Sequence, residues 1–146
     1  MVKPIVYGPA HADDGYRVVG ERVHVLARGD ETGAGEAFIQ EGPPGMGPPP
    51  HVHPWDEAYL MLEGEMDVLL GDRQLHLTPG MFVYVPANTV HNFRYTTPGR
   101  FFSYTSAAGA AQFFRELDRD APELPPDLPR VIAVAERNNV RLPPPR

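Results

Sequence analysis

Cysteine is absent from this 146-residue chain, which excludes disulfide bonds, thiolate metal ligands and a cysteine nucleophile. The chain also lacks any uninterrupted apolar run of roughly eighteen residues, the length that a transmembrane helix needs. The first nine residues do not combine a basic region with an apolar run of signal-peptide length. From these absences we expect a cytoplasmic protein.

Positive charge is scarce as well. The 13 Lys and Arg residues are outnumbered by 19 Asp and Glu residues, which gives a formal net charge of −6. Proteins that bind nucleic-acid phosphates or anionic membranes present clustered basic side chains, and no such cluster is visible here. We therefore expect neither nucleic acid nor a membrane among the partners.

The pattern of turns predicts a single all-β domain over residues 1–146. The length suits one domain, and the sequence contains no internal repeat. Strands are expected at residues 17–27 and 36–41, around a polar turn at 29–35, with five further short strands up to about residue 104. Turn signals recur at intervals typical of a β-sandwich or barrel, at residues 42–45, 71–72, 79–80, 86–88 and 98–99.

The period of the apolar residues changes near the carboxyl end. Apolar residues between 109 and 120 have helical spacing, and a proline-rich linker at 122–129 precedes a second possible short helix at 130–139. We expect this helical tail, residues 109–146, to pack on the barrel or on another subunit. A frayed terminus is an equally good interpretation of its last few residues.

Three histidines and a glutamate have the spacing of a metal site. His51 and His53 are two residues apart, so in an extended segment their side chains point the same way. Glu57 opens a predicted strand after a short turn, and His91 arrives from a third segment. A lone His-x-His would usually be a surface feature, but two clusters that match one template make that reading improbable. Imidazole and carboxylate ligands together suit zinc, iron, nickel, copper or manganese, so we expect one divalent metal ion.

These two clusters resemble the two motifs of the cupin family. Residues 45–64 match the first motif without a departure, through Gly45, His51, His53, Glu57 and Gly64. Residues 80–95 resemble the second motif with two departures: Asn88 stands where the motif has Gly, and Tyr95 stands where it has Asn. Asn tolerates positive φ better than most residues, so the turn is expected to form. The resemblance implies a cupin jelly-roll β-barrel with a metal at the bottom of an open cavity.

Aromatic residues on the ligand-bearing faces predict an apolar cavity for a flat or aromatic ligand. A sugar site would show more convergent polar side chains. Each aromatic residue by itself is better explained as ordinary core; the argument depends on the group. On the strand at 36–41, either Phe38 and Gln40 or Ile39 face the cavity. On the last strand, either Phe102 and Tyr104 or Phe101 and Ser103 face it. The expected pocket residues are Phe38, Gln40, Trp55, Met61, Phe93 and Phe102.

Two other histidines leave one question about the ligands open. His24 and His76 each lie between apolar neighbours and are expected to face solvent. If those neighbours instead faced a subunit contact, either histidine could replace Glu57 at the metal, and Glu57 would then be free to act as a base.

Three functions fit a metal in an apolar barrel. The chain resembles the small single-domain cupins that act as aromatic polyketide cyclases in antibiotic biosynthesis. This implies that a metal, with zinc favoured, polarises a carbonyl during aldol-type ring closure of a poly-β-ketone. The alternatives are a quercetinase-like dioxygenase and a non-catalytic small-molecule binding protein. Glu57 and the tyrosines Tyr59, Tyr95 and Tyr104 are the candidate catalytic residues. Small cupins commonly exchange amino-terminal strands, so we expect a homodimer paired through Met1 to Tyr7.

Overall fold

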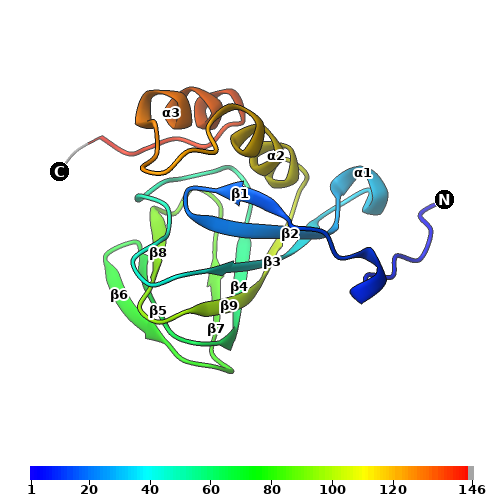
Figure 1. Cartoon of the computed structure of the whole chain (residues 1–146), viewed down its shortest axis with the longest axis horizontal. Helices are drawn as coiled ribbons and strands as arrows, with labels where there is room; N and C mark the ends of the chain where they lie inside the picture. The colour runs from blue at the N-terminus through cyan, green and yellow to red at the C-terminus, as the bar shows by residue number, and fades with distance from the viewer. Residues whose placement is uncertain (145–146) are drawn as a thin grey trace.

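The computed structural model describes residues 1–144, and its strands form two antiparallel sheets that face each other (Figure 1). The larger sheet has the order β1-β2-β3-β9-β4-β7, and the smaller has the order β6-β5-β8. The strands of the larger sheet are β1 (Tyr16–Val18), β2 (Glu21–Ala27), β3 (Glu36–Gly42), β9 (Gly99–Thr105), β4 (Glu57–Glu63) and β7 (Phe82–Val85). Those of the smaller sheet are β6 (Arg73–Leu77), β5 (Met66–Leu70) and β8 (His91–Tyr95).

The predicted strand at residues 17–27 is wrong in one respect, because it is a hairpin of two strands. Val19 (φ 47°) and Gly20 (φ 88°) form the turn between β1 and β2, and Val18 pairs with Glu21. A β-branched residue rarely adopts positive φ, so the sequence carries only Gly20 as a turn signal. The strand at 36–41 is confirmed as β3, while six strands rather than five follow it.

The two sheets enclose a core in which side chains alternate as the sequence predicts. On β4 the side chains of Tyr59 and Met61 are buried while Leu62 is exposed. Tyr59 packs edge-to-face on Phe101 at a centroid distance of 5.2 Å, a geometry that aromatic rings prefer. The cluster comprises Tyr59, Met61, Met66, Val68, Leu77, Val83, Val85, Phe93, Tyr95 and Phe101.

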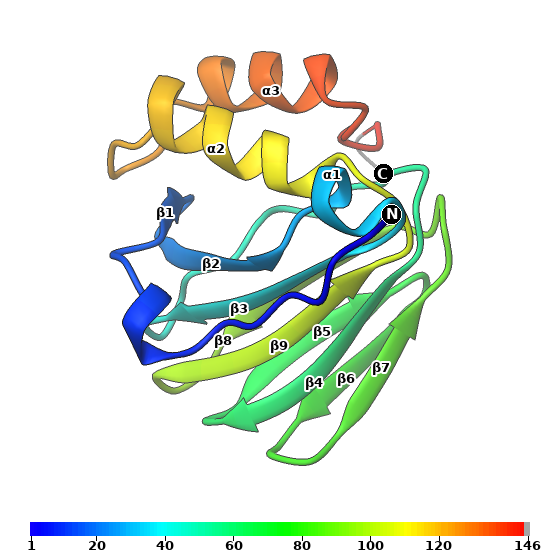
Figure 2. The ribbon, with the colours of Figure 1, turned by 90° about the vertical axis from the view of Figure 1, so that its right-hand side faces the viewer.

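Two helices cover one end of the sandwich, beside β1 and β2 (Figure 2). The helix predicted at 109–120 is confirmed as α2 (Ala110–Asp120). The second helix, α3 (Leu128–Arg137), begins inside the predicted linker because the Asp127 side chain accepts a hydrogen bond from the Arg130 amide and Pro129 fits the first turn. Two very short helices, η1 (Pro9–His11) and α1 (Gly29–Thr32), lie earlier in the chain, α1 within the predicted polar turn.

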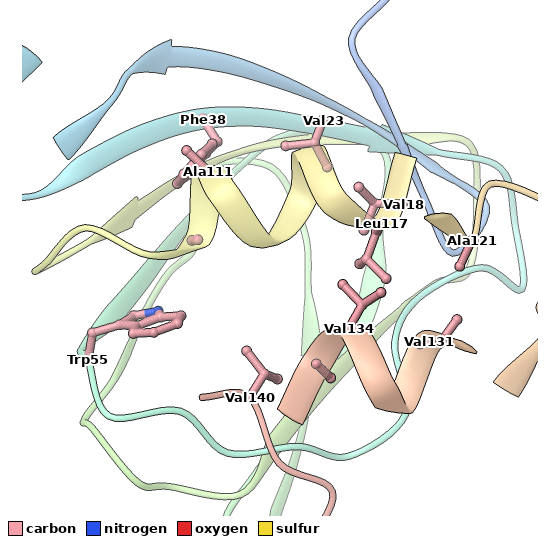
Figure 3. Close-up of a cluster of buried hydrophobic side chains, with 12 residues drawn as sticks. Val18, Val23, Phe38, Trp55, Ala111, Leu117, Ala121, Val131, Val134 and Val140 are labelled. Carbon is pink, nitrogen blue, oxygen red and sulfur yellow. The ribbon is translucent and has the colours of Figure 1, made fainter. Parts of the chain in front are cut away.

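The apolar faces of α2 and α3 close a second core over the end of the sheets (Figure 3). Leu117 of α2 and Val134 of α3 are almost fully buried in it, together with Val23 of β2 and Trp55. The predicted tail therefore packs on its own barrel. The helices therefore form part of the wall of the space inside the barrel.

A buried carboxylate fixes the start of α2. Glu36 of β3 accepts hydrogen bonds from the amides of Gly29 (2.9 Å), Gly109 (3.0 Å) and Ala111 (3.0 Å). Gly109 has φ 141°, and a Cβ there would lie 3.0 Å from the Trp55 ring. The helix can begin here because glycine allows both the backbone conformation and the close approach.

The amino-terminal residues 1–7 form neither helix nor strand. Their exchange with a second subunit stays a prediction. Within residues 1–144, none of the helices has the length and apolar character needed to cross a membrane.

Candidate metal centre

His51, His53 and His91 converge at one end of the sandwich. One ring nitrogen from each lies within 4.8 Å of those of the other two. His91 opens β8, and residue 51 is paired to it by two backbone hydrogen bonds of 3.0 Å, from His51 N to His91 O and from His91 N to His51 O. The segment of His51 and His53 is therefore placed by an isolated bridge instead of the regular strand that their spacing suggested.

All three imidazoles are oriented in the same way. The Nδ1 atom of each contacts a backbone carbonyl two residues away: His51 with Pro49 (2.9 Å), His53 with Trp55 (2.9 Å) and His91 with Thr89 (2.8 Å). A carbonyl can only accept, so Nδ1 carries a proton in each ring. Nε2 then holds the lone pair in the neutral form of a ring and a second proton in its charged form. This is how ligating histidines are usually held in metal sites.

Glu57, at the first position of β4, lies beside two of these histidines. Its Oε2 atom lies 2.8 Å from His53 Nε2 and 3.2 Å from His91 Nε2. Burial by itself raises the pKa of this carboxyl, but the hydrogen bonds from His53 and His91 outweigh it and hold the pKa of Glu57 well below its usual range. Glu57 is thus an anion among imidazoles.

The neighbouring histidines respond to that anion differently. Burial lowers the pKa of His91, but the hydrogen bond and charge of Glu57 outweigh it, so that its pKa lies above the usual value. Burial, and then the charge of His91, lower the pKa of His51 to about 3. His51 is therefore a neutral base near pH 7, the form that binds metals.

The chemistry of these donors fits a divalent metal ion. With Nδ1 protonated, each contact between Glu57 and an Nε2 atom requires a proton that the pair must share. A cation in the same place would satisfy the carboxylate and the lone pairs together, because metal binding replaces protons on its ligands. Three imidazole nitrogens and one carboxylate oxygen suit zinc and several transition metals alike.

His24 and His76, the two suggested alternatives to Glu57, lie away from this centre. His24 Nε2 contacts Glu41 Oε1 at 3.2 Å. His76 is half-exposed and pairs with Asp67 (2.7 Å) and Glu65 (3.2 Å). Neither contacts the three-histidine group, so the structure does not support the alternative in which one of them replaces Glu57.

A cavity opens beside the three histidines, and part of the predicted pocket lines it. Gln40, Trp55, Tyr59 and Phe93 face this space together with His51, His53 and Glu57. Trp55 also stacks on the His53 ring, with a centroid distance of 4.6 Å and an interplanar angle of 10°.

Several other predicted positions are corrected. Tyr104 is 41% exposed and Phe102 shares its outward face of β9, whereas Phe101 and Ser103 point inward. The side chains on a strand alternate, so the choice between these two sets depends on pairing with β3 and β4, which the sequence of β9 does not specify. Phe38 and Met61 are buried in the two cores and do not line the cavity. Tyr95 is also absent from the lining, and its hydroxyl donates to Glu21 Oε1 at 2.8 Å.

The sequence analysis missed two parts of the lining. One is the cover formed by α2 and α3. The spacing of apolar residues predicts these helices but not the place on the barrel where they pack. The other is Glu21, which shares one face of β2 with Val23 and Val25. This spacing is the signal for an inward side chain. The lining residues from these parts and from the adjoining loops are Val18, Val19, Glu21, Pro48, Pro49, Ala110, Phe113, Phe114, Leu117, Val131, Ala135, Val140 and Leu142.

Comparison with known proteins agrees with this geometry. Residues 38–104 match the family described as the cupin domain. This match covers less than half of the chain, while the two facing sheets with two carboxyl-terminal helices have the cupin fold.

Similarity at the sequence level extends to an enzyme. Over 80 residues the chain is 32% identical to quercetin 2,3-dioxygenase of Bacillus subtilis (strain 168), and this alignment covers 53% of the chain and 24% of the relative. The chain thus spans about a quarter of the length of that curated relative.

Solved structures share the fold at low sequence identity. KdgF from Halomonas sp. superposes with a TM-score of 0.65 at 19% identity, over 74% of this chain and 97% of the other. A mutant of salicylate 1,2-dioxygenase from Pseudoaminobacter salicylatoxidans has a TM-score of 0.57 at 11% identity, over 63% of this chain and 28% of the other.

Proposed function

We propose that this protein is a metal-dependent dioxygenase that acts on a neutral aromatic small molecule with adjacent oxygen substituents. The observation that carries the proposal is the convergence of three imidazoles, each oriented by its own Nδ1–carbonyl contact, of which His51 and His53 line an apolar cavity together with Glu57. Such a site can accept two oxygen atoms of a substrate next to an ion.

The cavity supports the substrate class. No Lys or Arg is among the described residues that line it, so a phosphate or carboxylate of the substrate would find no cationic side chain there. Most of the wall is aliphatic or aromatic, including Phe93, Phe113 and Leu117. A flat, neutral ring system suits such a surface better than a sugar does.

The reaction class is supported by the similarity to quercetin 2,3-dioxygenase over 80 residues of the chain. That enzyme is about four times longer than the aligned stretch, so its activity comes to this chain only as a proposal. We therefore rank the dioxygenase above the polyketide cyclase, which the resemblance to small single-domain cupins favoured.

Each residue has a defined part in the proposed reaction. His51, His53, His91 and Glu57 would hold the metal, which supplies Lewis-acid chemistry and, if it is redox-active, access to dioxygen. Trp55 holds the His53 ring by stacking and by its backbone carbonyl. The apolar residues of α2 and α3 exclude water from the bound substrate.

A metal-dependent polyketide cyclase, with zinc favoured, is the second candidate. The observation that favours it is the hydroxyl of Tyr59, which is buried and has no hydrogen-bond partner in the described structure. Such a hydroxyl can donate a proton to a carbonyl oxygen during an aldol-type ring closure, which needs no oxidant. The same four ligands would serve both reactions.

Metal analysis of the purified protein, combined with oxygen uptake in the presence of quercetin, separates the candidates. Iron, nickel, copper or manganese together with quercetin-dependent oxygen uptake would support the dioxygenase. Stoichiometric zinc without oxygen uptake, and a cyclised product from a poly-β-ketone, would favour the cyclase. Binding of quercetin without turnover of either substrate would indicate a non-catalytic binding protein.

A pair of variants ties the outcome to the three-histidine group. We expect His51→Ala to reduce the metal content at least tenfold and to abolish turnover, because one of three nitrogen ligands is lost. His76→Ala is the matched control, since this histidine contacts only surface carboxylates and should leave the metal content unchanged. Normal turnover by metal-free His51→Ala would refute a metal-dependent mechanism.

A further inference from the structure

A buried carboxyl group of the cavity has no part in the metal site. Glu21, at the start of β2, is 4% exposed and lines the same cavity as His51, His53 and Glu57. Its Oε1 atom accepts the hydroxyl hydrogen of Tyr95 at 2.8 Å. The described residues offer its second oxygen no hydrogen bond.

Other buried glutamates outside the metal site show what a purely structural carboxylate looks like in this chain. Glu36 uses both oxygens to accept backbone amides. Glu116 also uses both, accepting from Arg137 at one oxygen and from Asn138 at the other. Glu21 differs from both because half of its hydrogen-bonding capacity remains unused beside a cavity.

Tyr59 is the second polar group with unused capacity in the same cavity. Its side chain is fully buried, and its hydroxyl has no partner among the described residues. A buried polar atom without a partner costs roughly 1–3 kcal/mol, and a ligand that supplies the missing hydrogen bond removes this cost. Together with the unused carboxyl oxygen of Glu21 in the same cavity, this hydroxyl points to a polar atom of the ligand.

We propose that Glu21 and Tyr59 form a second polar site in the cavity, which binds a hydroxyl group of the substrate. The inference rests on the proposed function in taking the ligand to be a flat aromatic molecule. It deepens that function by naming a substrate class, the polyhydroxylated aromatics, in which one pair of oxygens faces the metal and another hydroxyl faces Glu21.

The ionisation of Glu21 supports this role. Burial raises the pKa of Glu21 to about 8, although the hydrogen bond from Tyr95 lowers it and the charge of Glu57 raises it further. The carboxyl is therefore mostly neutral at pH 7. A neutral carboxyl group can both donate to and accept from a phenolic hydroxyl.

Two flavonol probes test the second polar site. 3-Hydroxyflavone carries the adjacent hydroxyl and carbonyl oxygens of a flavonol, and quercetin adds hydroxyl groups on its outer rings. We would measure the dissociation constants of both by calorimetry on the zinc-loaded protein at pH 7. The wild-type protein should bind quercetin about tenfold more tightly than 3-hydroxyflavone, which corresponds to about 1.4 kcal/mol.

Variants then assign this preference to the two side chains. Glu21→Leu alone would leave the Tyr95 hydroxyl buried and unpaired, so the change is made as the double variant Glu21→Leu/Tyr95→Phe and compared with Tyr95→Phe. The double variant and Tyr59→Phe should each lose most of the preference for quercetin. Tyr95→Phe should keep it, and so should Glu21→Gln, whose amide also donates and accepts.

The outcomes separate the two proposals. A ratio of affinities that is the same in the wild-type protein and all four variants would overturn the second polar site, as would failure of both flavonols to bind. A preference that depends on Glu21 and Tyr59, without oxygen uptake by the iron-, nickel-, copper- or manganese-loaded protein, would establish the site and remove the dioxygenase.

Discussion

At the scale of single residues, the candidate metal centre is organised by contacts that are local in sequence. Each histidine places its Nδ1 atom on a carbonyl only two residues away, so the direction of each ring is set within its own turn. Asn88, the departure from the second motif, has φ 63° as predicted, and its amide donates to the carbonyl of His53 at 2.8 Å. The turn before His91 is thereby tied to the segment of the other ligands.

Proton competition at His91 makes a first prediction. Because Glu57 raises the pKa of His91, protons compete with the metal for this imidazole already above the ordinary histidine value of about 6.5. We expect the apparent zinc affinity to fall progressively as pH decreases from about 8 to 5. Competition with a chelating dye over pH 5–8 measures it, and an unchanged affinity at pH 5 would contradict ligation by His91.

The raised pKa of Glu21 makes a second prediction, on stability. The folded protein retains a proton on Glu21 that the unfolded chain releases between about pH 4.5 and 8. The folded state thus binds more protons than the unfolded state in this window. The contribution of Glu21 to the free energy of unfolding therefore falls as pH rises, by at most about 1.4 kcal/mol per pH unit.

Urea unfolding of the wild-type protein and Glu21→Gln between pH 6.5 and 8 tests this sign. This window lies above the range in which the depressed pKa of His51 has its opposite effect, a gain of stability with rising pH up to about 6.5. The stability of Glu21→Gln relative to the wild-type protein should increase with pH. A constant difference would mean that the folded protein holds no proton on Glu21 in this range, which contradicts the raised pKa.

At the scale of secondary structure, the metal site depends on two backbone bridges made by the segment of residues 51–53. Residues 51–53 do not extend a sheet, but they join β8 through the bridge between His51 and His91, and the bridge between Val52 and Arg141 ties them to the chain after α3. The cover of the cavity and the ligand segment are thus fastened to each other. A shift of α3 would therefore also displace the segment that carries His51 and His53.

Glu36 makes the third prediction, because it holds α1 and the start of α2 through three backbone amides. Glu36→Ala would leave these buried donors without a partner, and we expect the free energy of unfolding to fall by about 3 kcal/mol or more. Urea denaturation measures this change. Glu63→Ala is the control: this carboxylate is exposed and only loosely paired with Arg100 at 3.9 Å, so its loss should cost less than about 1 kcal/mol.

At the scale of the whole molecule, the outer face of the larger sheet is unusually apolar. Phe82 is 62% exposed and Tyr84 48% exposed on the edge strand β7, and Tyr104 lies on the same side of β9. Exposed apolar groups that gather on one face mark interaction sites, and an uncovered edge strand can pair with another chain. This face favours the homodimer that the sequence analysis expected, through a different surface.

Light scattering coupled to size-exclusion chromatography tests the fourth prediction. We expect a dimer for the wild-type protein and a shift toward monomer for Phe82→Lys, since a charge would be buried in the contact. Gln74→Lys on β6, an exposed position in the other sheet, should not change the mass. Removal of residues 1–7 tests exchange of the amino termini, and monomeric wild-type protein would contradict both surfaces.

The sequence by itself determined the all-β class, the two motifs, the metal-ligand candidates and the helix at 109–120. Those features depend on the alternation of side chains, on spacing within short segments and on turn residues, all of which are local. Only the tertiary structure decided that Phe101 and not Phe102 points inward, that α2 and α3 cover the cavity, and that Glu21 meets Tyr95, 74 positions away. Strand register and helix docking are set by contacts between distant segments, which no local pattern contains.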